Sequence, residues 1–203
     1  MNSNVQPRIG IFAGTFDPVH SGHVSFALQA RETAGLDEVC FVPERQPRDK
    51  PGVEHFGHRV AMLRQAIKPY DNFSLLELVD RQFTVRRTLP GLKQLYGDAK
   101  LVLVMGSDTF HGIRHWSHVS ELLKSVEFVV GVRSQHDLAA VLQSAQALKA
   151  PLQMITVVDS VEPGVSSSQV RKALRLQVPI DGLLPSVEQY AKREWLYARV
   201  PTR

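Results

Sequence analysis

Cysteine is nearly absent from this sequence, since its 203 residues contain one, Cys40. A single cysteine excludes a disulfide bond within the chain. Cys40 lies in the apolar run Val39-Cys40-Phe41-Val42, which indicates a core-filling role for its small side chain. This cysteine usage favours a reducing compartment, and we expect the protein in the cytoplasm.

Long apolar runs are absent as well. No stretch approaches the roughly twenty apolar residues needed to cross a bilayer, and the polar residues 1–8 lack the apolar segment of a signal peptide. We therefore expect a soluble protein with no membrane partner. The chain also has no internal repeat or low-complexity tract. Its length and its 43% of hydrophobic residues predict a single domain over residues 1–203, with a small C-terminal helical region from about residue 166.

Runs of one charge sign are missing too. The 24 Lys and Arg residues exceed the 20 Asp and Glu residues by a formal charge of +4, and they are scattered along the chain. This pattern gives no indication of nucleic-acid binding, and it suits a polyanionic small molecule equally well. The sequence leaves the oligomeric state open, a homo-oligomer included.

Near its start the sequence contains a predicted strand, then a turn with glycine, and then two histidines. Residues 9–13 are apolar without alternation, as in a strand covered on both faces, and Gly14 then lets the backbone approach a ligand closely. His20 and His23 fall about three residues apart around a predicted helix start, where they would share one face. Free amide hydrogens and the positive end of the helix dipole gather there, and imidazoles donate further hydrogen bonds to phosphate. The run predicts a phosphate site.

Further along, buried strands alternate with amphipathic helices. The predicted strands cover residues 9–13, 38–42, 72–80, 101–105, 128–132 and 154–158. The predicted helices cover residues 24–34, 53–67, 84–96, 119–126, 138–148, a stretch beginning near 166, and 185–195. In the third helix Thr84 is the candidate cap, and Pro90 favours a start as late as Leu89. This alternation predicts an α/β fold with an open, doubly wound parallel sheet, whose ligands bind beyond the carboxyl ends of the strands.

Several polar segments follow those carboxyl ends. Residues 43–52 are rich in proline and charge, which fits a solvated connection and a functional loop about equally. Gly106 and Asp108 follow the clearest buried strand. Arg59 lies off the apolar stripe of its helix, which favours a surface position rather than a ligand contact.

Serines cluster where a helix is predicted to begin, at residues 166–168. A helix N-cap explains them without any function. Together with Arg171 they also fit a phosphate clamp, in which a helix N-terminus, hydroxyl groups and a guanidinium surround one anion. The sequence leaves both roles open.

The ten residues from Gly14 to His23, Gly-Thr-Phe-Asp-Pro-Val-His-Ser-Gly-His, closely resemble the signature of the nucleotidyltransferase superfamily of adenylyl- and cytidylyltransferases, whose hallmark is His-x-Gly-His. Further motifs are similar to those of the bacterial nicotinate-nucleotide adenylyltransferases. One motif is Met105-Gly106-Ser107-Asp108, followed by Trp116 and the pair Leu122-Leu123. A second motif is the segment from Val165 to Arg171. The others are Pro43, Pro47 and Lys50, which resemble part of a Pro-Pro-His-Lys loop, and Phe83-Thr84 with Thr88-Leu89.

Two departures from that family's pattern stand out. Arg48 and Asp49 replace Pro-His before the lysine, and the spacer between Thr84 and Thr88 is one residue longer than usual. Both departures fall in regions that, by the resemblance, help to hold the pyridine nucleotide. Adenylyl transfer is therefore better supported than the identity of the acceptor.

The resemblance implies a Rossmann-like fold and transfer of AMP from ATP to nicotinate mononucleotide, with Mg²⁺ bridging the triphosphate oxygens. By the same resemblance the substrates are ATP and a pyridine mononucleotide, and the products are deamido-NAD and pyrophosphate. The reaction would then be a step of NAD biosynthesis. The implied catalytic residues are His20, His23 and Arg171. The implied ATP-binding residues are Gly14, Thr15, Phe16, Gly22, Lys50, Ser167 and Ser168. The implied mononucleotide-binding residues are Thr84, Gly106, Asp108 and Trp116, and no residue is implied as a metal ligand.

The same residues are compatible with different functions. A sister enzyme would use nicotinamide mononucleotide or phosphopantetheine as acceptor, and a nucleotide-binding regulator would keep the pocket without turnover. The Trp116 side chain fits two roles, stacking on the pyridine ring or ordinary packing in the core. The His-x-x-His pair alone fits structural histidines or a metal site, although no cysteine cluster and no third histidine at ligand spacing accompany it. A redox Rossmann protein is disfavoured because the first turn lacks Gly-x-Gly-x-x-Gly.

Overall fold

A six-stranded parallel sheet forms the centre of the computed structural model, which describes residues 6–48, 50–148, 150–159 and 164–198. The strands lie in the order β3-β2-β1-β4-β5-β6, and each pairs in parallel with its neighbours. Their bounds are β1 Arg8–Gly14, β2 Glu38–Pro43, β3 Phe73–Leu75, β4 Lys100–Gly106, β5 Glu127–Val132 and β6 Ile155–Asp159. The order reverses between β1 and β4, where such sheets open a crevice for ligands. The predicted doubly wound α/β sheet is confirmed.

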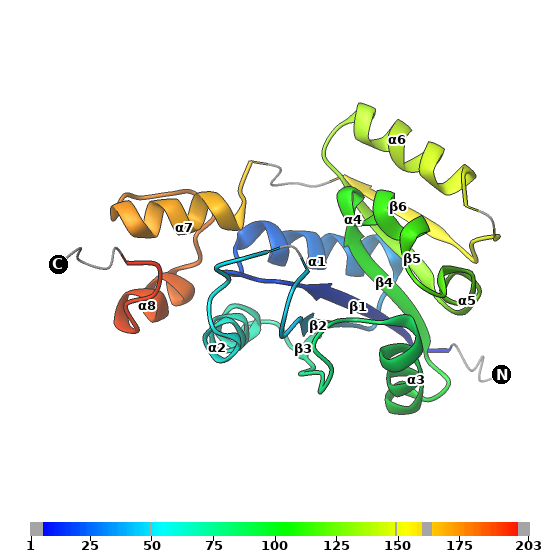
Figure 1. Cartoon of the computed structure of the whole chain (residues 1–203), viewed down its shortest axis with the longest axis horizontal. Helices are drawn as coiled ribbons and strands as arrows, with labels where there is room; N and C mark the ends of the chain where they lie inside the picture. The colour runs from blue at the N-terminus through cyan, green and yellow to red at the C-terminus, as the bar shows by residue number, and fades with distance from the viewer. Residues whose placement is uncertain (1–5, 49, 149, 160–163, 199–203) are drawn as a thin grey trace.

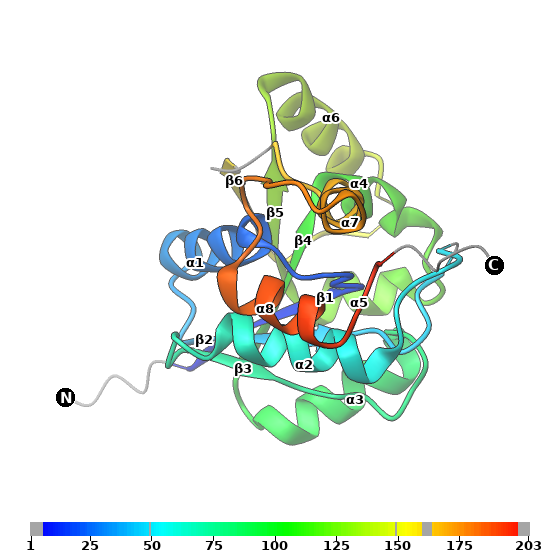
Figure 2. The same ribbon diagram turned by 90° about the vertical axis from the view of Figure 1, so that its left-hand side faces the viewer.

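Helices cover both faces of the sheet (Figures 1 and 2). Their bounds are α1 Ser21–Ala34, α2 Phe56–Ile67, α3 Val85–Tyr96, α4 Ser107–Gly112, α5 Val119–Ser125, α6 Gln135–Gln146, α7 Ser167–Leu176 and α8 Pro185–Arg193, with a 3₁₀ turn at Ile113–His115. The apolar sides of α1, α2 and α8 share one core, and those of α3 to α6 share the other. Among the described helices, none has both the length and the apolar character to cross a membrane.

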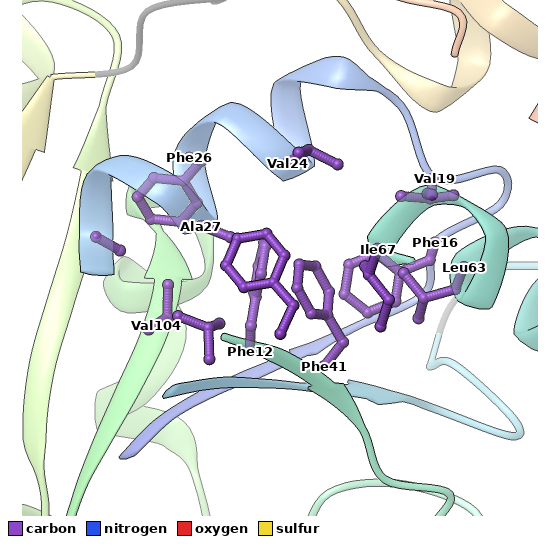
Figure 3. Packing of buried hydrophobic residues seen from close by; sticks show 14 of the residues in the cluster. Phe12, Phe16, Val19, Val24, Phe26, Ala27, Phe41, Leu63, Ile67 and Val104 are labelled. Carbon is purple, nitrogen blue, oxygen red and sulfur yellow. The ribbon is translucent and has the colours of Figure 1, made fainter. Parts of the chain in front are cut away.

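An aromatic cluster fills the core beneath α1. Phe12 of β1 packs edge-on against Phe16 and Phe26, with ring centroids 5.4 and 5.5 Å apart, and it also contacts Phe41 of β2 (Figure 3). Gly131 lies beside this cluster, because a Cβ atom there would come within 2.7 Å of the Phe26 ring. The cluster therefore anchors the start of α1, and with it both histidines, on the sheet.

Several predicted boundaries need correction. α1 begins at Ser21, three residues before the predicted start at Val24, because His20 and His23 cap it. α3 begins at Val85 and accommodates Pro90 in its second turn, so the later start at Leu89 is wrong. β3 spans three residues of the predicted 72–80 strand. Cys40 is buried in the core as predicted. Asp49 and residues 1–5 lie outside the described residues.

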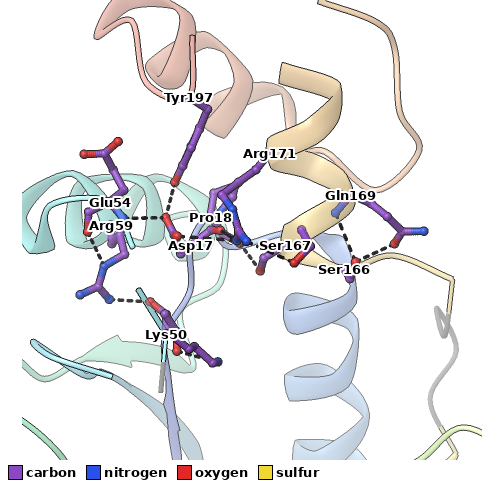
Figure 4. Close-up of polar contacts among 12 residues, drawn as sticks. Asp17, Pro18, Lys50, Glu54, Arg59, Ser166, Ser167, Gln169, Arg171 and Tyr197 are labelled. Atoms are coloured by element: carbon purple, nitrogen blue, oxygen red, sulfur yellow. Dashed lines mark hydrogen bonds and ion pairs between the residues drawn. The ribbon is translucent and has the colours of Figure 1, made fainter. Parts of the chain in front are cut away.

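The predicted surface position of Arg59 is wrong, because its side chain is 1% exposed. Its guanidinium donates hydrogen bonds to backbone carbonyl groups of three separate segments, at distances of 2.5 to 3.2 Å. The four acceptors are the carbonyl oxygens of Thr15, Glu44, Arg45 and Glu54. Arg59 thus fastens the loops after β1 and β2 to the start of α2 (Figure 4). Its buried charge is solvated by carbonyl dipoles, which the apolar stripe of α2 does not reveal.

Arg59→Lys should lower the free energy of unfolding by about 2 kcal/mol, because a lysine ammonium group cannot reach all four backbone carbonyl groups at once. Urea titration at neutral pH measures this loss. Arg64→Lys on the same helix is the matched control. Arg64 pairs with Glu77 at 2.6 Å, but its side chain is 64% exposed, so the change should stay within about 0.5 kcal/mol. Equal losses at the two positions would contradict the role given to Arg59.

Candidate active site

A cavity of about 550 Å³ opens at the carboxyl ends of β1, β4 and β5. Gly14, Gly106 and Gly131 at or near these strand ends form part of its wall, and the N-terminal residues of α1 and α7 form another part. Twelve of the fourteen predicted site residues line it, ten of which were assigned to catalysis or ATP binding. These ten are Gly14, Thr15, Phe16, His20, Gly22, His23, Lys50, Ser167, Ser168 and Arg171. Gly106 and Asp108 line it as well, which leaves Thr84 and Trp116 outside.

His20 and His23 lie together at the N-terminus of α1, with ring centroids 3.8 Å apart. His20 is the N-cap residue, and Nδ1 of His23 accepts a hydrogen bond from the His20 backbone amide at 3.2 Å. Since Nδ1 is an acceptor, the proton of a neutral His23 ring is on Nε2. The ring also packs against Phe16, at 5.1 Å between centroids. His23 is thus a neutral hydrogen-bond donor in a fixed orientation.

Burial holds the pKa of His23 well below its ordinary value of 6.5, and the electrostatic influence of His20 and Lys50 lowers it further. The site therefore contains a neutral His23 imidazole at neutral pH. Positive potential in the cavity comes instead from the helix N-termini and from the side chains of Lys50, Arg133 and Arg171.

The N-terminus of α7 faces the same cavity. Ser166 is the N-cap and accepts a hydrogen bond from the Gln169 amide at 3.3 Å, so the predicted capping role holds for this serine. Ser167 donates to the Pro18 carbonyl at 2.9 Å. Arg171 donates to the hydroxyl of Ser168 at 3.2 Å. The two roles predicted for the serine cluster are therefore compatible, because Ser166 caps the helix while it and the two following serines all line the cavity.

Lys50 folds over the cavity and donates to the Thr15 hydroxyl at 2.9 Å (Figure 4). The sequence predicted that a ligand approaches the backbone closely at Gly14. The Phe16 ring limits that space, because it would lie 2.9 Å from a Cβ atom at this position. Phe16 is 2% exposed and adopts a left-handed backbone conformation, with φ of 48°. Its ring is therefore part of the core beneath the cavity. Gly22 is similarly confined, since a Cβ atom would lie 2.9 Å from Val165.

Sequence reasoning assigned no role to two charged residues of the cavity wall, Asp17 and Arg133. Asp17 is part of the signature without a predicted role, yet it is 3% exposed and contacts both α7 and the C-terminal segment. Arg133 follows β5 directly and adds an exposed guanidinium to the wall. A polar residue directly after a buried strand is the signal that could have identified Arg133, because such residues gather at the ligand-binding edge.

Thr84 and Trp116 are not among the residues that line the cavity. Trp116 is half-buried, and its ring lies 6.1 Å from that of Phe83, the neighbour of Thr84. The Thr84 hydroxyl is buried and has no hydrogen-bond partner among the described residues. Both residues therefore lie outside the cavity wall that the other twelve predicted residues help to form.

Comparison with known proteins agrees with these motifs. A family model described as cytidylyltransferase-like matches residues 11–173. A probable nicotinate-nucleotide adenylyltransferase of Carboxydothermus hydrogenoformans is 37% identical over 188 residues, covering 90% of this chain and 93% of that protein. The nicotinate-nucleotide adenylyltransferase of Bacillus subtilis is 33% identical over 198 residues, covering 94% of this chain and 98% of that protein. The chain belongs to the nicotinate-nucleotide adenylyltransferase family. The resemblance found in the sequence is confirmed.

A solved structure shares the fold of this family member. It is the Plasmodium falciparum nicotinic acid mononucleotide adenylyltransferase complexed with NaAD, with a TM-score of 0.75 over 95% of this chain and 98% of that chain. At 20% identity this likeness concerns the fold alone. Of the two departures from the family pattern, Arg48 donates to the Gln82 side chain at 2.7 Å. Arg86 and Arg87 of the longer spacer are exposed on the first turn of α3.

The low pKa of His23 predicts a pH dependence of stability. The unfolded chain binds a proton near pH 6.5 that the folded chain excludes, so the free energy of unfolding should fall as the pH drops below 6.5. The loss approaches about 1.4 kcal/mol per pH unit until the folded-state pKa is reached. His23→Gln, which does not titrate, should remove this part of the slope. Urea titrations between about pH 7.5 and 5.5 measure it, and identical slopes in the two proteins would contradict the prediction.

Proposed function

We propose that this chain transfers the adenylyl group of ATP to nicotinate mononucleotide, forming deamido-NAD and releasing pyrophosphate. The observation that carries the proposal is that two helix N-termini, of α1 and α7, face one cavity with His20, His23 and Arg171 around it. Helix N-termini bind anions through free amide hydrogens and the helix dipole. Two of them on one cavity suit a polyphosphate better than a single phosphate.

The reaction needs positioning and charge stabilisation more than covalent help. An oxygen of the mononucleotide 5′-phosphate forms a bond to the α-phosphorus of ATP, while the bond from that phosphorus to the oxygen bridging to the β-phosphate breaks. The electron pair leaves on pyrophosphate. Negative charge is spread over the phosphoryl oxygens in the transition state, so preorganised donors supply most of the catalysis.

Each phosphate-facing residue has a role that follows from its position. His23, as a neutral Nε2–H donor beside His20, stabilises the oxygens of the α- and β-phosphates and the departing pyrophosphate. Ser168 and Arg171 at the start of α7 hold the β- and γ-phosphates. Lys50 neutralises further charge as its loop covers the cavity, in the manner of a lid.

Mg²⁺ enters this proposal with ATP. Within the described ranges of the chain, no group of three or more His, Cys, Asp or Glu side chains lies together as a metal site. The donor set therefore suits an ion that would be held mainly by triphosphate oxygens. Such an ion would neutralise charge developing on pyrophosphate.

The acceptor is assigned to nicotinate mononucleotide because the relatives that cover almost all of this chain carry that name. In this assignment Gly106 and Asp108 face the mononucleotide from the cavity, and the pair of Thr84 and Trp116 holds its pyridine end. The buried Thr84 hydroxyl supports this, since it has a hydrogen-bonding capacity unused among the described residues.

Pyrophosphate release from ATP, measured with nicotinate mononucleotide, nicotinamide mononucleotide and phosphopantetheine, tests the function. Turnover should be fastest with nicotinate mononucleotide. His23→Ala should lower kcat by about 10²-fold or more, because the donor acts on charge developing in the transition state. His136→Ala, an exposed histidine on α6 outside the cavity wall, is the control and should keep wild-type turnover. ATP binding without pyrophosphate release in the presence of any of the three acceptors would instead identify a nucleotide-binding regulator.

Trp116→Ala should raise KM for the mononucleotide about fivefold and leave KM for ATP unchanged, because stacking on an aromatic ring contributes about 1 kcal/mol. Steady-state kinetics with each substrate varied in turn separates the two effects. Trp195→Ala is the matched control, since Trp195 is 81% exposed in the C-terminal segment. An unchanged KM for the mononucleotide in Trp116→Ala would leave Trp116 as a core residue that packs on Phe83.

A further inference from the structure

Asp17 is a buried meeting point of four segments (Figure 4). Its Oδ1 atom accepts a hydrogen bond from the Tyr197 hydroxyl at 2.6 Å and a longer one from the Glu54 amide at 3.4 Å. Its backbone carbonyl accepts from Nη1 of Arg171 at 2.7 Å. Its Oδ2 atom lies 3.6 Å from the same Nη1. The side chain that completes the phosphate clamp is therefore next to a buried carboxylate.

This carboxylate competes with a phosphate for Arg171. A charge-assisted hydrogen bond between guanidinium and carboxylate measures about 2.7–2.9 Å. At 3.6 Å, Arg171 and the Asp17 carboxylate therefore do not form one. The Tyr197 hydroxyl holds the other oxygen and fixes the rotation of the carboxylate. Arg171 therefore keeps guanidinium hydrogens for the cavity that it lines.

Tyr197 reaches Asp17 from the far end of the chain. It lies in the segment after α8, where Trp195 and Tyr197 adopt left-handed backbone conformations with φ of 55° and 60°. Such conformations are costly for these residues and persist where surrounding contacts enforce them. Burial raises the pKa of Tyr197, and the Asp17 carboxylate raises it further, so the hydroxyl stays protonated and remains a donor. Tyr197 is not part of the cavity wall.

We propose that Tyr197 is a positioning residue for ATP binding: its hydroxyl holds the Asp17 carboxylate away from Arg171, which leaves the Arg171 guanidinium available to the triphosphate. This inference rests on the proposed function, because it assumes that Arg171 binds ATP phosphates. It adds the segment after α8 to the determinants of nucleotide affinity. Without the hydroxyl, the Asp17 carboxylate turns toward Arg171 and forms a direct hydrogen bond with its guanidinium.

Calorimetric titration of the full chain with MgATP and, separately, with nicotinate mononucleotide tests the proposal. Tyr197→Phe should raise Kd for MgATP about tenfold, the effect of losing one hydrogen bond to a charged group. Kd for the mononucleotide should not change. In turnover assays, KM for ATP should rise while kcat stays within about twofold of wild type.

Tyr190→Phe is the matched control. Tyr190 also lies in the C-terminal region and has a hydroxyl in a hydrogen bond, 3.0 Å from Nδ1 of His58, but it has no contact with Asp17. Its removal should leave both Kd values at wild-type level, and thermal unfolding of both variants measures any loss of stability.

The outcomes separate the two claims. Equal MgATP affinity in wild type and Tyr197→Phe would overturn the positioning role and leave the proposed function standing. Parallel losses of affinity for both substrates, or the same loss in Tyr190→Phe, would also overturn it, because they indicate a general structural effect. A wild-type chain that binds no MgATP would overturn the proposed function, and the positioning role with it.

Discussion

The hydrogen bond from Arg171 to the backbone carbonyl of Asp17 is the interaction on which the site depends. It joins the start of α7 to the loop after β1, two segments that lie 154 residues apart in the sequence. The neighbouring bond from Ser167 to the Pro18 carbonyl adds a second tie between the same segments. Without these contacts the N-termini of α1 and α7 would not face one cavity, and neither helix alone would bind more than a single phosphate.

Burial determines the chemistry of the site. The aromatic cluster of Phe12, Phe16 and Phe41 supports α1 from below and excludes water from His23, which keeps that imidazole neutral. Positive charge comes instead from Lys50, Arg133 and Arg171 on the cavity wall and from the helix dipoles. Buried groups thus fix the orientation of the donors, and half-buried or exposed side chains supply the positive charge.

The sequence predicted the features that depend on local patterns. Apolar runs identified the strands, and the spacing of His20 and His23 identified a helix start, because both signals extend over a few neighbouring residues. The roles of Arg59 and Tyr197 could not be predicted in this way. Each is polar at a position that local patterns favour for the surface, and its burial follows from acceptors in distant segments. Nor did any local pattern indicate that Trp116 and Thr84 would lie outside the main cavity, since that depends on how α3 and α4 pack.

The most direct test of this account is a crystal structure of the chain with Mg²⁺ and a non-hydrolysable ATP analogue. The account predicts a triphosphate lying between the N-termini of α1 and α7, with His23 near the α- and β-phosphates and Arg171 near the β- and γ-phosphates. A triphosphate bound elsewhere, with His23 and Arg171 both more than a hydrogen bond away from any phosphate oxygen, would contradict it.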